Sequence, residues 1–233
     1  MQDPKRAGAA NGLLAALPQR KYRELSAALE PVVLNFGDVL LEPGEAIRHV
    51  FFPGDSLVSL LTDEGPRAVE VGLVGPEGMV GISLALGIDV SPFRALVQGT
   101  GTALRMRSGH FLAEFRKNPQ LQRELLRYSH ALMAQVTQIS ACNRLHRIEP
   151  RLARWLLMTR DRLRSNEFRL THEFLGHMLG VRRVGITQAA STLQRRKLIA
   201  YERGNIRILD ARRLEEASCR CYGIVKAFFD SAR

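Results

Sequence analysis

Cysteine is scarce in this sequence, and its scarcity excludes several kinds of site. The chain of 233 residues has three cysteines, Cys142, Cys219 and Cys221. An odd number without a regular spacing argues against a disulfide-stapled fold and favours a reduced, cytosolic compartment. Only one residue separates Cys219 from Cys221, whereas paired zinc ligands usually have about two to four between them, and three thiolates are too few for an iron–sulfur cluster. We therefore expect no metal and no cofactor.

Long apolar runs are also missing. No stretch approaches the ~18 apolar residues of a membrane span, and the N-terminus lacks the apolar core of a secretory signal. The run LLAAL (13–17) is too short for either, and Gly12 and Pro18 flank it. The sequence predicts a cytoplasmic protein without a membrane partner, with a flexible tail over residues 1–20.

Acidic residues are few in the C-terminal part. Residues 1–145 carry 15 basic and 14 acidic side chains, whereas residues 146–233 carry 19 basic and 9 acidic ones. The net charge is therefore +1 in the first part and +10 in the second. Such asymmetry is typical of a near-neutral module joined to one that binds a polyanion, although a basic surface that only aids solubility is the alternative.

Signatures of catalysis are absent as well. GLVGPEGMVG (72–81) has no lysine of the kind that a phosphate-binding loop requires. His172, Glu173 and His177 lack the spacing of a zinc-protease motif. We therefore expect that the protein is not an enzyme.

Glycine recurs at short intervals between residues 30 and 108. The runs between the glycines are rich in β-branched and large apolar residues, as in HVFF (49–52) and AVEVGLV (68–74). Short apolar runs between turn signals predict a β-sandwich or barrel.

A long helix is predicted to begin at Pro119, since proline is favoured in a first helical turn. Apolar or semi-apolar residues recur along it at alternating steps of four and three, as in a coiled coil. The seam consists of Leu121, Leu125, Tyr128, Leu132, Gln135, Ile139 and Cys142. We favour a parallel two-helix dimer contact along this seam, with Gln135 fixing the register. Burial of the same stripe against the chain's own β-region is the alternative.

Residues 171–199 meet the requirements of a helix-turn-helix. Leu175 and Leu179 give the first helix an apolar face, Gly176 permits a close helix crossing, and Gly180 suits a left-handed turn. The second helix has a face of apolar residues: Val181, Ile186, Ala189, Ala190 and Leu193. Pro150 is expected to open the helix that precedes this pair, with Trp155 packed in the core of the same small domain.

The other face of the second helix is expected to enter a major groove with its N-terminal end. It carries Arg182, Arg183, Val184, Thr187 and Gln188. Arginine can donate two hydrogen bonds to guanine and can also bind a phosphate. Gly185 is expected to let the backbone approach DNA. Thr171 is predicted to cap the first helix and to contact a phosphate.

A β-hairpin is predicted after this pair of helices. Gly204-Asn205 lies between the strand-like LIAY and IRIL. Arg203, Asn205 and Arg207 are predicted phosphate contacts at the tip of this hairpin, and residues from Ala211 onward are predicted to form one last amphipathic helix. The order helix, helix, hairpin in a basic segment is that of a winged helix-turn-helix, which we assign to residues 146–233.

From about Leu29 to Cys221 the chain resembles the Crp/Fnr family of bacterial transcription regulators. The motifs are the turns Gly37-Asp38 and Pro43-Gly44-Glu45, the long helix after Asn118-Pro119, and the helix-turn-helix after Leu170-Thr171. The resemblance implies an α+β fold: a β-roll of double-stranded β-helix or jelly-roll type (21–118), a long dimerisation helix with a hinge (119–145), and the winged domain. It also implies a homodimer on a two-fold symmetric operator in double-stranded DNA, with RNA polymerase as a partner.

The effector pocket that the resemblance implies departs from the pattern of cyclic-AMP-binding members. Those members carry Gly-Glu-Leu and Arg-Ser-Ala where this chain has Gly81-Ile82-Ser83 and Phe93-Arg94-Ala95. The glutamate expected on the ribose is Ile82, and the arginine expected on the phosphate is Phe93. In a strand, Arg94 should face the opposite side. We expect an effector other than cyclic AMP, or none.

Three functional alternatives stay open at this point. A regulator that needs no effector is one, and a nucleoid-type protein with broad, salt-sensitive DNA binding is another. Fnr-type oxygen sensing lacks an N-terminal cysteine cluster. Haem ligation through His49, His110 or His130 is the third alternative.

Overall fold

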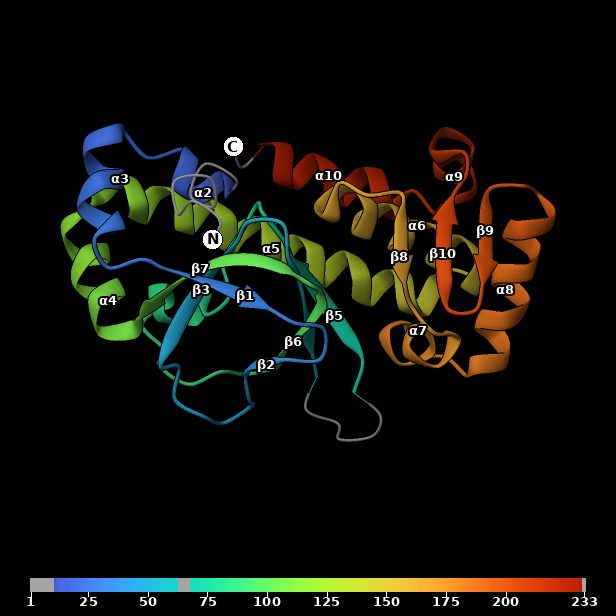
Figure 1. The fold of residues 1–233 in the computed structure, drawn as a ribbon, viewed down its shortest axis with the longest axis horizontal. Helices are drawn as coiled ribbons and strands as arrows, with labels where there is room; N and C mark the ends of the chain where they lie inside the picture. Colours follow the sequence, from blue (N-terminus) through green and yellow to red (C-terminus); the bar gives the residue numbers. More distant parts are fainter. Residues whose placement is uncertain (1–10, 63–67, 232–233) are drawn as a thin grey trace.

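Antiparallel strands build the N-terminal part of the computed structural model, which describes residues 11–62 and 68–231 (Figure 1). They form a three-stranded sheet, β1-β7-β3, and a four-stranded sheet, β2-β6-β4-β5. The strands are β1 (Glu30–Leu34), β2 (Val39–Leu41), β3 (His49–Pro53), β4 (Leu57–Leu61), β5 (Glu70–Val74), β6 (Arg94–Gly99) and β7 (Gly101–Arg107). Between β5 and β6, Gly81 adopts a φ of 93° and leads into the short 3₁₀ helix η2 (Ile82–Leu86). The β-region predicted from the glycine-separated runs is confirmed.

The residues described before β1 form two short helices. These are α2 (Gly12–Ala15) and α3 (Gln19–Ser26). The side chain of Asn11 is fully buried and donates to the carbonyl oxygens of Pro53 and Gly78, both at 2.9 Å. The predicted flexible tail over residues 1–20 is wrong for residues 11–20, because they form α2 and the start of α3 and bury Asn11, Leu13, Leu14 and Leu17 in a core shared with the two sheets, here called the β-domain. Residues 1–10 lie outside the described part.

Helices α4 (Ser108–Lys117) and α5 (Pro119–Leu145) follow β7. The side chain of Asn118 accepts a hydrogen bond from the backbone N–H of Leu121 at 3.1 Å, so α5 begins with a capped first turn at Pro119, as predicted. In Figure 1, α5 runs from the β-domain to the C-terminal part, and α10 (Cys221–Ser231) lies along it.

The heptad seam of α5 is buried inside the chain. Its members Leu121, Leu125, Tyr128, Leu132, Gln135 and Ile139 are at most 7% exposed. The Tyr128 hydroxyl donates to the carbonyl of Met79 (3.3 Å), and the Gln135 amide donates to the carbonyl of Leu73 (3.1 Å). The predicted dimer contact along this seam is therefore wrong. A 3-4 periodicity serves equally for a helix that packs one face on its own domain, and here it does so.

The C-terminal part has the predicted winged order, with two differences. Its elements are α6 (Ile148–Leu163), β8 (Glu167–Arg169), α7 (His172–Leu179), α8 (Arg183–Arg195), β9 (Ile199–Glu202), β10 (Asn205–Ile208), α9 (Ala211–Ala217) and α10. Strand β8 adds to the hairpin, so the wing is a three-stranded sheet with the order β8-β10-β9. The prediction of a single last helix is wrong: an extended residue, Ser218, ends α9 and separates it from α10.

Buried polar bonds join α6 to the β-domain. The Trp155 indole N–H donates to Glu70 Oε1 (2.8 Å), and the Ser59 hydroxyl donates to Glu70 Oε2 (2.7 Å). Burial raises the pKa of Glu70 to about 7. Arg162 pairs with Glu77 at 2.6 Å (Nε to Oε1). Trp155 therefore packs between the two parts of the molecule, rather than only within the small domain as predicted.

None of the helices within the described ranges is both long enough and apolar enough to span a membrane.

Candidate nucleic-acid interface

Helices α7 and α8 meet at a tight turn, and the residues expected to shape it do so. Thr171 caps α7, because its hydroxyl oxygen accepts a hydrogen bond from the N–H of Phe174 at 3.1 Å. Gly180 ends α7 with a φ of 62°, in the left-handed region. A Cβ on Gly176 would lie 2.9 Å from the carbonyl oxygen of Val181, so a larger residue would push the turn away.

Helix α8 buries one face and exposes the other. Ile186, Ala189, Ala190 and Leu193 are all at most 6% exposed, and α8 packs on α6. The side chains of Arg182, Arg183, Val184, Thr187 and Gln188 are exposed. Among the described residues, no carboxylate forms an ion pair with Arg182 or Arg183. Figure 1 shows α8 on the outer side of the C-terminal part, away from the strands of the β-domain.

Thr187 also has a role inside the chain. Its hydroxyl donates to the carbonyl of Arg183 (3.1 Å) and lies 3.0 Å from Nδ1 of His172. The His172 ring stacks on Tyr201, with ring centroids 4.2 Å apart. Burial, and secondly the charge of Arg183, lower the pKa of His172, so the ring is neutral near pH 7. His172 thereby links α7, α8 and β9, a role that the sequence analysis did not assign.

Packing inside the chain explains why residue 185 is a glycine. A Cβ at this position would lie 2.7 Å from Cδ1 of Ile148, at the start of α6. The missing side chain therefore lets α8 pack closely on α6, and the approach of the Gly185 backbone to DNA stays a prediction.

The wing turn is one residue earlier than predicted. Glu202 pairs with Asn205, so the two-residue loop is Arg203-Gly204, and both residues have positive φ angles of 50° and 83°. Two positive φ angles are typical of the type I′ turn that suits a hairpin. Arg203 alone lies at the tip, and Asn205 and Arg207 lie along β10. The prediction that all three are at the tip is wrong for these two.

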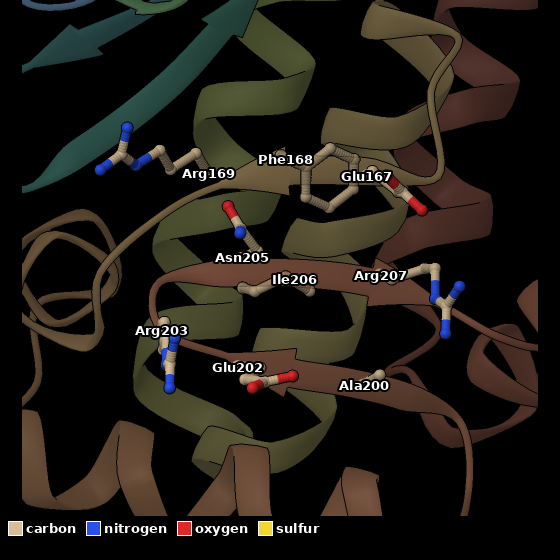
Figure 2. Close-up of a pocket in the computed structure, with 9 residues that line it drawn as sticks. All are labelled: Glu167, Phe168, Arg169, Ala200, Glu202, Arg203, Asn205, Ile206 and Arg207. Carbon is tan, nitrogen blue, oxygen red and sulfur yellow. The ribbon is translucent and has the colours of Figure 1, made fainter.

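The outer face of the wing sheet forms a shallow hollow of about 600 Å³ (Figure 2). It is lined by Glu167, Phe168, Arg169, Ala200, Glu202, Arg203, Asn205, Ile206 and Arg207. Phe168 and Ile206 are buried from the other side of the sheet, and Figure 2 shows Arg203 and Arg207 well apart along the sheet. Because Glu167 and Glu202 alternate with the arginines, this face suits a polyanion less well than the exposed end of α8 does.

The positions of the expected effector pocket carry no free cation. Arg94 donates from Nε to Oε2 of Glu42 at 2.7 Å, so its charge is already paired. Ile82 and Ser83 are buried in η2 at 5% and 8% exposure, and Phe93 is half-buried.

A cluster of thiols and an imidazole lies near the end of α5, where the sequence analysis expected no metal site. Cys142, His146, Cys219 and Cys221 place one sulfur or nitrogen atom each within 4.8 Å of all the others. The Cys142 and Cys219 sulfurs are 3.4 Å apart, and their hydrogen bond lowers the pKa of Cys142 and raises the pKa of Cys219. These four residues can hold a metal ion.

The cluster was not predicted because only one residue separates Cys219 from Cys221, fewer than paired zinc ligands usually have between them. A signal was present: Cys142 and His146 are four residues apart, the spacing that places two ligands on one face of a helix. What the sequence could not give is the folding of α10 back along α5, which brings Cys219 and Cys221 to this helix end.

Comparisons with known proteins agree with this geometry. Residues 150–217 match the model of the Crp-like helix-turn-helix domain. The whole structure is similar to FixK2 from Bradyrhizobium japonicum, with a TM-score of 0.68 and 13% identity over 82% of this chain and 98% of that one. It is also similar to TTHB099, a transcriptional regulator of the CRP family from Thermus thermophilus, with a TM-score of 0.66 and 18% identity over 80% of this chain and 96% of that one.

A third similar structure is the c-di-GMP-responsive global regulator CLP from Xanthomonas campestris, with a TM-score of 0.62 and 14% identity over 82% of this chain and 99% of that one. No curated protein matches the sequence. At such identities the solved structures establish the fold, while the domain match falls on the segment from α6 to α9 that carries the exposed arginines.

Proposed function

We propose that this chain is a DNA-binding transcription regulator of Crp/Fnr type, and that it reads a specific DNA sequence through the exposed N-terminal end of α8. One observation carries the proposal. Arg182 and Arg183 are exposed without an ion-pair partner among the described residues, on a helix whose other face is buried against α6. A pair of unsatisfied guanidinium groups at the front of a supported helix suits guanine edges and phosphates.

The remaining contacts follow from the position of α8. Arg182, Arg183 and Gln188 are the base-facing residues, and the exposed Val184 suits a thymine methyl group. Thr171 and Arg203 contact phosphates on either side. The first N–H groups of α8 add an anion-binding end, since a helix N-terminus attracts phosphate.

The regulator acts as a homodimer, but through a different face of α5 from the buried seam. Leu126 and Met133 are seven residues apart on the exposed side, at 54% and 63% exposure. Exposed residues continue this line at alternating steps of three and four: Leu126, His130, Met133, Thr137, Ser140 and Arg144. Such a line suits a parallel helix pair, which would present two copies of α8 to a two-fold symmetric operator.

Cyclic AMP is not the effector. A cyclic phosphate buried without a cation would be costly, and Arg94 is already paired with Glu42. Ile82 offers no carboxylate to a ribose hydroxyl. The protein therefore responds to another ligand or binds DNA without one.

Nucleoid-type binding is the second candidate, and the net charge of +10 in residues 146–233 is what favours it. It predicts affinity that depends on salt and little on sequence. The buried support of α8 favours sequence reading, since an unspecific binder does not require a fixed helix at the groove.

Selection of genomic DNA fragments by the purified chain, without added ligand and over a series of salt concentrations, separates these functions. We expect one palindromic motif that survives moderate salt. The nucleoid-type function would be supported instead by weak binding that shows no motif and is lost as salt rises. This result would have to hold both without ligands and with each nucleotide of a screen.

A further inference from the structure

We propose that Cys142, His146, Cys219 and Cys221 bind one zinc ion in tetrahedral Cys₃His coordination, and that this ion fastens the α9–α10 turn to the hinge between α5 and α6. Cys142 lies in the last turns of α5, His146 is the residue that ends α5, and the other two cysteines flank the start of α10. The four ligands therefore come from two segments that are more than 70 residues apart in the sequence.

The spacing of the ligand atoms fits a single ion. In a tetrahedral zinc site with Zn–S bonds of about 2.3 Å, neighbouring ligand atoms are about 3.8 Å apart. Here Cys142 and Cys219 are 3.4 Å apart, Cys221 Sγ is 3.5 Å from His146 Nδ1, and no pair exceeds 4.8 Å. An iron–sulfur cluster would need wider spacing, because its own iron and sulfide atoms lie between the thiolates.

The surroundings provide what such a site requires. Cys142 and Cys221 are fully buried and Cys219 is 7% exposed, while half-buried His146 leaves an entry path. The Gln138 amide donates to Cys221 Sγ at 3.1 Å, the kind of outer hydrogen bond that orients a ligand.

The charge balance points to the same occupant. Arg154 is 2% exposed, and among the described residues no carboxylate forms an ion pair with it. Within the described part of the chain its Nε has no hydrogen-bond partner, and its Nη1 donates to the sulfur of Met158, a weak acceptor. A buried guanidinium requires a compensating anion. Three thiolates, a neutral imidazole and Zn²⁺ carry one net negative charge, which the buried guanidinium groups of Arg154 and Arg151, both within electrostatic reach of Cys142, would stabilise. On binding, the thiols release their protons to solvent.

The ion has a mechanical consequence. Helix α10 packs on α5 and α6, and the N–H of Cys219 donates to the carbonyl of Pro150 in α6. Zinc at this point would hold the end of α5, the hinge and α10 as one unit. The orientation of the DNA-binding part relative to α5 would then depend on metal or on thiol oxidation.

The test uses the full-length, untagged chain, purified anaerobically with a reductant. Elemental analysis is expected to find one zinc per chain after dialysis, and cobalt replacement should give the visible bands of tetrahedral cobalt with a thiolate-to-metal band in the near ultraviolet. Cys142→Ser and Cys221→Ser should lose the metal, and His146→Ala should weaken its retention against a chelator at least tenfold. His110→Ala, an exposed histidine on α4, is the matched control and should retain the metal fully.

Three results would overturn the proposal. One is a reduced wild-type chain that neither retains added zinc nor shows the cobalt bands. Another is a Cys142–Cys219 disulfide as the only stable form found by mass spectrometry. The third is the absorption of an iron–sulfur cluster after reconstitution with iron and sulfide. If the serine variants fail to fold, the cobalt spectrum of the wild-type chain still decides, since it needs no substitution.

Discussion

Two groups of residues contrast in this molecule. In one group the charges are paired and the apolar side chains are buried within the chain, and in the other they are exposed without such partners among the described residues. In the β-domain and at its junction with α6, Arg94 and Arg162 pair with Glu42 and Glu77. At the end of α8, by contrast, Arg182 and Arg183 have no carboxylate partner among the described residues. The same contrast holds along α5, where one heptad face is buried and the other is open. Under the proposed function, partners bind at the exposed set and not at the paired one.

The largest expected effect tests the open face of α5. Replacing Met133 with Asp places a charge at the centre of the proposed helix pair and should produce monomers. Loss of two-site binding should reduce operator affinity by about 100-fold or more. Ile88→Asp, at an equally exposed apolar residue of the β-domain, is the control and should remain dimeric. Analytical ultracentrifugation combined with DNA titration measures both, and a persisting Met133→Asp dimer would reject this face.

The next effect concerns the pH dependence of stability that comes from Glu70, a buried residue where the β-domain meets α6. Burial raises the pKa of Glu70 from 4.5 to about 7, so the folded state keeps a proton that the unfolded chain releases between these pH values. The stabilisation is complete below pH 4.5 and is lost as the pH rises through 7. Its size is on the order of 3 kcal/mol.

Urea unfolding of the wild-type chain at pH 5 and pH 8 measures this loss. Glu70→Gln keeps an acceptor for the Trp155 indole but does not titrate, so its free energy of unfolding should lack this part of the pH dependence. If the free energy of unfolding depended on pH equally in the two proteins, Glu70 would be ionised already at pH 5. Its contacts between the β-domain and α6 would then differ from those described.

A pair of matched arginine changes sharpens the comparison directly. Arg183→Ala should weaken operator binding by roughly 1–3 kcal/mol, because a bidentate base contact is lost. Arg94→Ala removes an arginine that is paired with Glu42 in the β-domain, and it should change DNA affinity by less than about 0.5 kcal/mol. Equal losses in the two variants, measured by titration at fixed salt, would remove the distinction between exposed and paired arginines.

The smallest effect is expected at the wing tip. Arg203→Ala should weaken binding to operator and unrelated DNA alike, by under about 1 kcal/mol, and lower the dependence of log affinity on log salt by about one. A change confined to one base position would instead make Arg203 a base contact. Arg207→Ala, on the mixed-charge face of the same sheet, is the control.

Local signals predicted most of the helix-turn-helix. Gly176 and Gly180 carry their structural roles in their own conformation and contacts, and the apolar spacing of α8 fixes which face is buried. Thr171 is likewise recognisable as a helix cap, because the helical pattern begins directly after it. Such features depend on a few neighbouring positions, so a single sequence reveals them.

The sequence-based predictions failed where the function of a residue depends on a packing partner far away in the sequence. The heptads of α5 describe a helix that buries a stripe, and the sequence does not state whether the partner is another chain or its own β-domain. Gly185 lacks a side chain where α8 packs against Ile148, a residue nearly 40 positions away in the sequence. The cluster around Cys142 depends on the same long-range packing, since α10 must return along α5 before the cysteines meet.

The most direct test of the central proposal is a cycle between Arg183 and single base pairs of the selected operator. Affinities of the wild-type chain and of Arg183→Ala are measured for every single-base-pair variant, with Arg195→Ala, at the exposed far end of α8, as the control. We predict one position per half-site at which the wild-type chain and the control discriminate by about 1–3 kcal/mol and Arg183→Ala does not. Unchanged discrimination at every position in Arg183→Ala would show that the front of α8 does not read the sequence.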